Sequence, residues 1–100
     1  MESHFTINLS LEGPGGKITY GQFSLGKDKK EAIEIFSLLK GSAENVPGCS
    51  LKMEFMEEMM GLPIPIGTIN CCLDELKENI AIISREIFRI AHLENANTDG

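Results

Sequence analysis

Hydrophobic and polar residues alternate along the first part of the chain. Between His4 and Glu12, every second residue from Phe5 to Leu11 is apolar, and the residues between them are polar. A strict two-residue period is typical of a strand with one buried and one solvated face. The turn-forming sequence at residues 13–16 then ends this predicted strand.

A second strand is predicted over residues 17–25. Its apolar positions follow the two-residue period up to Tyr20, and the period is shifted from Phe23 onward. Gly21 lies at the shift, and a glycine inside a strand often marks a β-bulge. A bulge at Gly21 would return the residues from Phe23 onward to the buried face of a hairpin.

The first helix is predicted from Lys29 to Lys40. Asp28 is a favourable N-cap residue, and Glu31 lies three residues later, as in a capping box. Gly41 provides a residue for the C′ position. One wide apolar stripe runs along the predicted helix, formed by Ala32, Ile33, Ile35, Phe36 and Leu39.

Residues 51–60 fit either a helix or a strand. Their leucine, lysine, methionine and glutamate residues favour a helix, whereas the alternation of apolar and charged residues at its start favours a strand. The segment that follows decides for the strand, because Pro63 and Pro65 force their neighbours to be extended. An extended apolar segment needs a partner, so a second hairpin is predicted with its turn near Met60 and Gly61. The prolines lack N–H donors, which predicts a sheet edge.

The second predicted helix is long and has a clear apolar period. Asn70 or Cys72 is its candidate N-cap, and Cys72 would place Glu75 at the capping-box position. Acidic residues near its start and basic residues near its end complement the helix dipole. The polar tail, residues 95–100, is expected to fray. The apolar stripe comprises Leu73, Leu76, Ile80, Ile83, Ile87 and Ile90.

The order of these elements predicts an α+β fold. Two strands and a helix are followed by two strands and a helix (ββαββα), in a single domain over residues 1–94. The simplest arrangement is a four-stranded antiparallel sheet with both helices packed on one face. The predicted core consists of Phe5, Ile7, Leu9, Phe23, Ile33, Phe36, Phe55, Leu76, Ile80 and Ile83.

Several short motifs resemble a family of small uncharacterised proteins from Bacteroidetes-type bacteria. They are the helix entry Asp28-x-x-Glu31, the strand Phe55-Met56-Glu57 followed by Gly61-Leu62-Pro63, and the helix start Leu73-Asp74-Glu75-Leu76. The resemblance covers most of the chain and implies the same order of two hairpins and two helices. The family has no assigned activity, so it implies no function.

Composition and charge exclude several classes of protein. With 100 residues, 42% hydrophobic and 24% charged, the chain has an ordinary globular composition. A formal net charge of −6 argues against binding to nucleic acid or to an anionic membrane surface. The chain shows neither a secretory signal nor a membrane-spanning segment, and Cys49, Cys71 and Cys72 are therefore expected to be free thiols in a reducing cytoplasm.

No motif in the sequence predicts a catalytic residue, a cofactor or a metal site. The glycine-rich turn opens into a strand, whereas a phosphate-binding loop opens into a helix. His4 and His92 lie near the chain ends, outside any nucleophile motif, and are interpreted as surface residues. The carboxylates of Glu54, Glu57 and Glu58 are interpreted as a solvated acidic strand.

Methionines give the sequence its one functional hint. Methionine is over-used at adaptable binding surfaces, and Met56, Met59 and Met60 form the candidate interaction surface, while Met53 fits the core. The leading hypothesis is a cytoplasmic, non-catalytic module that binds a protein partner or forms a homodimer. The alternative is a small-molecule-binding domain or minor enzyme with its pocket at a dimer interface.

Overall fold

The computed structural model describes residues 3–44 and 50–99, with side chains as far as residue 91. The order of elements is ββαββα, so the predicted α+β class is confirmed. The elements are β1 (Ser3–Gly13), β2 (Gly16–Gly26), α1 (Lys29–Ser37), β3 (Leu51–Met59), β4 (Leu62–Cys71) and α2 (Leu73–Asp99).

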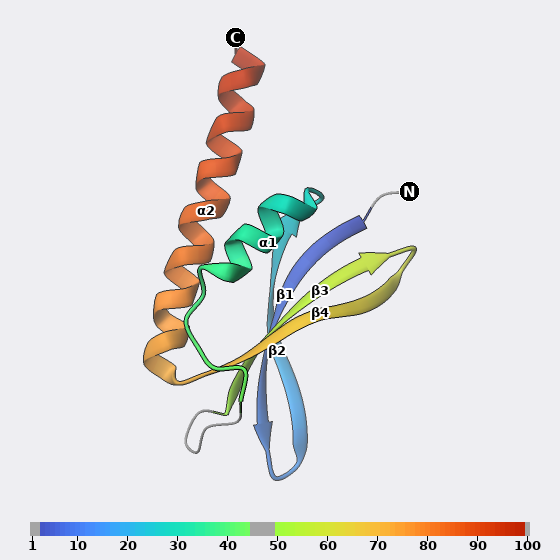
Figure 1. Cartoon of the computed structure of the whole chain (residues 1–100), viewed down its shortest axis with the longest axis vertical. Helices are drawn as coiled ribbons and strands as arrows, with labels where there is room; N and C mark the ends of the chain where they lie inside the picture. The colour runs from blue at the N-terminus through green and yellow to red at the C-terminus, as the bar shows by residue number, and fades with distance from the viewer. Residues whose placement is uncertain (1–2, 45–49, 100) are drawn as a thin grey trace.

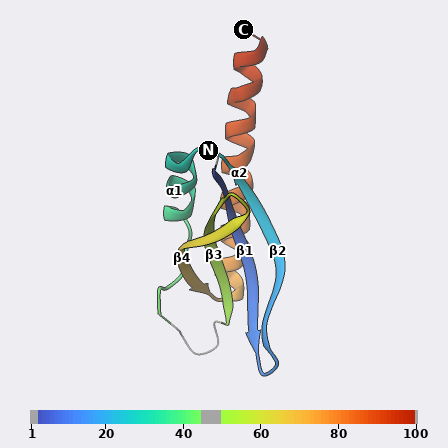
Figure 2. The same cartoon turned by 90° about the vertical axis from the view of Figure 1, so that its right-hand side faces the viewer.

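The four strands form one antiparallel sheet in the order β2-β1-β3-β4. The first strand of each hairpin, β1 or β3, lies at the centre of the sheet. These two strands pair with each other, and Ile7 lies opposite Phe55. Both helices lie on the same face of the sheet, α1 toward β4 and α2 toward β1 and β2 (Figures 1 and 2). The predicted edge is confirmed, because β4 carries Pro63 and Pro65 and is the outermost strand on its side.

The predicted bulge in the first hairpin is also confirmed. Leu9 pairs with Gly21, whereas the next residue, Ser10, pairs with Thr19, which leaves Tyr20 as the extra residue. A side chain at position 21 would be tightly packed, since a Cβ atom there would lie 3.3 Å from Cδ1 of Leu9. Glycine at this position therefore accommodates both the bulge and the close approach of β1.

The second hairpin closes with a two-residue turn that decides between strand and helix for residues 51–60. Met59 pairs with Leu62, and the intervening Met60 and Gly61 both have positive φ angles, 54° and 80°. Two central residues with positive φ are typical of a type I′ turn, whose twist matches that of antiparallel strands. The strand interpretation and the predicted turn are both confirmed.

Helix α1 begins as predicted and ends three residues early. Its N-cap Asp28 accepts a hydrogen bond from the backbone N–H of Glu31 at 3.1 Å. The prediction that the helix extends to Lys40 is wrong, because its last residue is Ser37. The side chain of Asn79 binds both the N–H and the C=O of Lys40, at 2.7 and 2.8 Å, and so holds that residue outside the helix.

Helix α2 is capped by Cys72, the second of the two candidates. The backbone N–H of Cys72 donates to the Glu75 carboxylate at 2.9 Å, and its C=O accepts from Leu76. The helical backbone continues through the polar segment predicted to fray, as far as Asp99. A helix satisfies its own backbone hydrogen bonds, so it needs no neighbour to continue beyond the sheet. The C-terminal part of α2 projects past the sheet in Figure 1.

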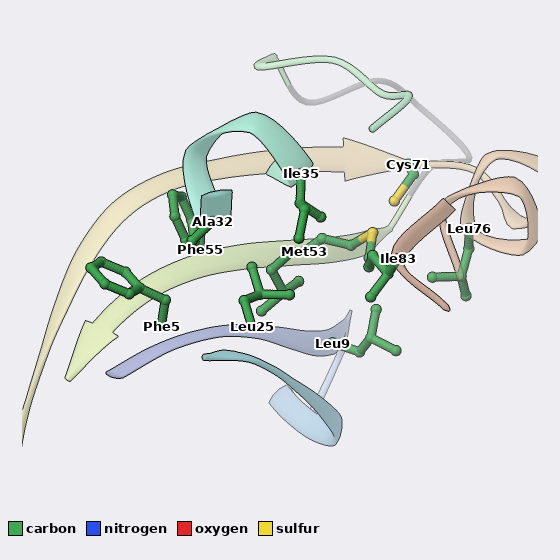
Figure 3. Packing of buried hydrophobic residues seen from close by; sticks show 11 residues of the cluster. Phe5, Leu9, Leu25, Ala32, Ile35, Met53, Phe55, Cys71, Leu76 and Ile83 are labelled. Carbon is green, nitrogen blue, oxygen red and sulfur yellow. The ribbon is translucent and has the colours of Figure 1, made fainter. Parts of the chain in front are cut away.

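The core lies between the sheet and the two helices, as Figure 3 shows. Eight of the ten predicted core residues belong to it, with Phe23 and Phe36 only partly buried. Ile33 and Ile80 were predicted wrongly, because 45% and 37% of their surfaces are exposed. Each lies next to the residue that takes the buried position, Ala32 in α1 and Asn79 in α2. Among the described residues, no helix is both long and apolar enough to cross a membrane.

Candidate functional site

The three methionines of the predicted interaction surface do not form one patch. Met56 pairs with Thr6 and lies on the sheet face opposite the helices, whereas Met59 pairs with Ser3 and lies on the helix side. Met60 occupies the turn and is 76% exposed, while Met56 and Met59 are half-buried. The structure therefore separates Met56 from the other two.

Exposed apolar residues of β4 adjoin Met59 and Met60, and α1 lies over the next part of β4. Lys29 at the start of α1 pairs with Glu57, which lies opposite Ile64, and Phe36 packs at Gly67. Ile33 therefore lies over the part of β4 between these two levels. We call the adjoining apolar residues of this hairpin the methionine surface: Met59, Met60, Leu62 and Ile64.

A second exposed apolar region runs along α2. Leu73, Ile80 and Phe88 are 73%, 37% and 75% exposed, and their spacing of seven and eight residues places them on one flank of a helix. We call these three residues the α2 stripe. The sequence assigned Leu73 and Ile80 to the buried stripe, and it gave no role to Phe88.

The sheet face opposite the helices is polar and internally paired. Glu54 of β3 accepts hydrogen bonds from Ser10 of β1 and Lys17 of β2. Lys52 pairs with Glu12 at 3.0 Å. These cross-strand pairs join oppositely charged groups of neighbouring strands, so this face is a solvated surface on which these four charged side chains are paired.

One pair on that face has the geometry of a nucleophile and a base. The Oγ of Ser24 and the Nε2 of His4 lie 2.9 Å apart. Acyl transfer also needs a group that orients the histidine and donors for the developing oxyanion. Glu58 lies opposite His4 in the sheet register, but among the described residues it makes no hydrogen bond with the imidazole. The pair is exposed, so water competes with any substrate held there.

The glutamates of β3 do not form a carboxylate pair. Glu54 lies on the polar face, whereas Glu57 lies on the helix side and binds Ser3 at 2.7 Å and Lys29 at 3.8 Å. Their side chains are only 19% and 12% exposed, so the prediction of a fully solvated acidic strand is wrong for these two residues. Within residues 3–44 and 50–91, no group of three or more possible metal ligands comes together.

The cysteines differ in state and in environment. Cys71 is a free thiol and is fully buried, whereas Cys72 is disulfide-bonded, which corrects the prediction of three free thiols. Cys49 lies outside the described residues. Burial raises the pKa of the Cys71 thiol, the charge of Glu75 raises it further, and a hydrogen bond with Asn79 lowers it.

We expect Cys71 to resist alkylation while the protein is folded. Its thiol is inaccessible, and its raised pKa shifts formation of the reactive thiolate to higher pH than in the unfolded chain. With iodoacetamide at neutral pH, labelling should be at least about a hundredfold slower in buffer than in concentrated urea. Mass spectrometry of the wild type and Cys71→Ser identifies the labelled thiol. Equal rates in buffer and urea would contradict the buried position.

Two buried amides join elements that are distant in sequence. Asn79 connects α2 to Lys40, and its Nδ2 also lies 3.4 Å from the sulfur of Met53. Asn70 donates from its side chain to the C=O groups of Ser42 and Glu44, and its backbone pairs with Ser42. A signal for Asn79 was present in the sequence, because a polar residue lies between Leu76 and Ile83 on the buried side of the helix.

Comparisons with known proteins identify no relative of this chain. No family model, no curated protein and no solved structure matches the chain.

Proposed function

We propose that the protein is a non-catalytic interaction module that presents the methionine surface to another protein. The observation that carries this proposal is Met60, which combines a positive φ of 54° with 76% exposure. Asparagine and glycine are the favoured residues in type I′ turns, so methionine costs stability there. Exposure of its apolar side chain to water lowers the stability of the fold further. A binding role explains why methionine is found there despite both losses of stability.

The surroundings of Met60 support the same role. Leu62 is 67% exposed and Ile64 is 43% exposed, so the turn and the start of β4 present adjoining apolar side chains. Methionine adapts its shape to different partners, and clustered exposed apolar residues mark interaction sites. The resemblance to the uncharacterised bacterial family implies no activity.

Affinity capture from a lysate of the source organism tests this role with three forms of the chain. Met60→Asn removes the apolar side chain and fits the type I′ turn better, so its free energy of unfolding should equal or exceed that of the wild type. Phe88→Asp is the control, since Phe88 is equally exposed but lies on α2. We expect one protein to be captured by the wild type and the control, and at least about tenfold less by Met60→Asn.

Equal capture by all three forms, measured by quantitative mass spectrometry, would overturn the role of the methionine surface. Loss of folding in Met60→Asn, detected by circular dichroism, would contradict the assignment of the turn itself.

A further inference from the structure

Strand β2 leaves one edge of the sheet open. It pairs with β1 on one side, and no described strand pairs with it on the other. The opposite edge of the sheet is protected, because β4 carries Pro63 and Pro65 and because Ser42 is bridged to Asn70 near the end of that strand. Strand β2 contains no proline. Its outer backbone groups are therefore available to a further strand.

The pairing of β1 shows which residues of β2 turn their backbone groups outward. The N–H of Glu12 donates to the chain that enters β3. Alternate residues of a strand direct their backbone groups to the same side, so Ser10 and Thr6 also direct theirs toward β3. Thr19 lies opposite Ser10, and Ser24 lies opposite Thr6. The N–H and C=O groups of Thr19 and Ser24 therefore point away from β1, toward the open edge.

The sheet and the helix layer are offset along β2. At the turn of the first hairpin the sheet extends beyond the helices, and Ile18 and Tyr20 are 63% and 51% exposed there. At the other end of β2, the C-terminal part of α2 continues past the sheet (Figure 1). An open apolar groove between β2 and α2 lies at this end, lined in part by Leu25, Ile87 and Ala91. The uncovered end of the sheet and the groove thus lie at opposite ends of one edge strand.

We propose that two copies of this chain pair through their β2 edges, antiparallel about a two-fold axis beside Gly21. Antiparallel pairing places the turn end of each β2 next to the groove of the other copy. Ile18 and Tyr20 of each copy then cover the groove of the other, so the same contact forms twice.

The groove also indicates why its occupant is a second copy. An added strand supplies main-chain hydrogen bonds, and its alternate side chains enter any pocket beside the edge. The strand that fills this groove must carry apolar side chains that face the helix layer and that its own helices leave uncovered. Strand β2 has such side chains in Ile18 and Tyr20, at the end that antiparallel pairing brings to the groove.

The bulge at Gly21 permits a register in which both strands match. Thr19 of one copy lies opposite Ser24 of the other in this register, and both residues direct backbone groups to the open edge. Ile18 then lies opposite Leu25, and both side chains face the helix layer. In an unbulged strand, residues 19 and 24 would point to opposite sides. A bulge can protect a sheet edge, but this one lies at the two-fold axis, between the two paired stretches.

The interface is small, and its expected affinity follows from that. One short stretch of strand pairing and two apolar side chains from each copy form a contact below the size of a permanent dimer. We therefore expect a dissociation constant in the micromolar range.

Sedimentation equilibrium from low to high micromolar concentration tests the proposal. The apparent mass of the wild type should rise with concentration from 11.0 kDa toward twice that value. Thr19→Pro removes the outward N–H and should weaken the association at least about tenfold. Thr19→Ala keeps that N–H, so it is the matched control and should associate like the wild type.

A second pair of variants tests the apolar contact without changing the backbone. Ile18→Asp places a charge against the groove and should also weaken the association at least about tenfold. Leu62→Asp is its control, because Leu62 is 67% exposed on the opposite edge strand, against 63% for Ile18. Urea melts at low concentration verify that all four variants fold. If Thr19→Pro did not fold, Ile18→Asp alone would decide.

Cross-linking with a short bis-maleimide tests the register. Gln22→Cys lies beside the two-fold axis and should give a covalent dimer above the wild-type background. Lys17→Cys should not, because the two copies of residue 17 would lie about 30 Å apart along the paired strands. A parallel pair would cross-link both variants and would overturn the antiparallel arrangement.

The outcomes separate this proposal from the role of the methionine surface. A wild type that stays at 11.0 kDa throughout, or a dimer unaffected by Ile18→Asp, would overturn the β2 interface and leave the capture experiment intact. A dimer lost only in Leu62→Asp would also overturn it, and would assign self-association to the methionine surface.

Discussion

Replacing Asn79 with leucine should lower the free energy of unfolding by about 2–4 kcal/mol. The Asn79 amide accepts a hydrogen bond from the N–H of Lys40 and donates one to its C=O, and the Asn79 side chain is fully buried. Leucine has a similar size and a higher helix propensity, so the change leaves the packing volume nearly unchanged, does not weaken the helix itself and removes both hydrogen bonds. Two partly buried backbone groups then lose their partners, which is more costly than losing the bonds alone.

Urea denaturation followed by circular dichroism measures this effect, with Lys40→Ala as its control. Asn79 binds only the backbone of Lys40, whose side chain is exposed, so Lys40→Ala should change the free energy of unfolding by less than about 0.5 kcal/mol. If Asn79→Leu unfolded within 0.5 kcal/mol of the wild type, the amide would not be the connection that joins α2 to the end of α1.

The secondary structure was predictable because its signals are local. Alternation at Phe5–Leu11, the Asp28 cap and the prolines of β4 each depend on residues near them in the sequence, and the structure confirms all three. The shift at Gly21 likewise predicted the bulge from a few neighbouring residues. Such signals determine an element without any knowledge of what packs against it.

The extent of burial was not predictable, because it depends on how far each helix covers the sheet. Ile18 pairs with Leu11 on the helix side of the first hairpin, yet it is 63% exposed because this end of the sheet extends beyond the helices. Ile80 fits the apolar period of α2 equally well as a core residue. Its neighbour Asn79 is buried instead, because the amide has a partner in Lys40, and that partner is 39 residues away.

The candidate site shows the same division between local and distant information. The turn at Met60 could be placed from the sequence, whereas its positive φ and its exposure depend on the fold. The predicted group of three methionines failed at Met56, since strand alternation turns it to the other face. Phe88 gave no signal, because an apolar residue one position beyond the period of a helix is common and usually uninformative.

Replacing Phe55 with alanine should have the largest effect on stability, a loss of about 3–5 kcal/mol in the free energy of unfolding. Phe55 is 1% exposed at the centre of the sheet. Its ring stacks on Phe36 of α1, with centroids 4.9 Å apart, and lies 6.1 Å from the ring of Phe5. Alanine would therefore lose the contacts with both α1 and β1 and leave a cavity between them. The cavity can close only if the helix or the sheet moves.

Phe88→Ala is the matched control, since it deletes the same side chain where 75% of it is exposed. It should change stability by less than about 0.5 kcal/mol. The double variant Phe55→Leu with Phe36→Leu should show a coupling of about 0.5–1.5 kcal/mol. Each single variant already removes the stacking contact between the two rings, so the double variant cannot lose it a second time. Additive effects of the two leucines would show that the rings contribute through burial alone, and an equal loss in Phe55→Ala and Phe88→Ala would contradict the placement of β3 beneath α1.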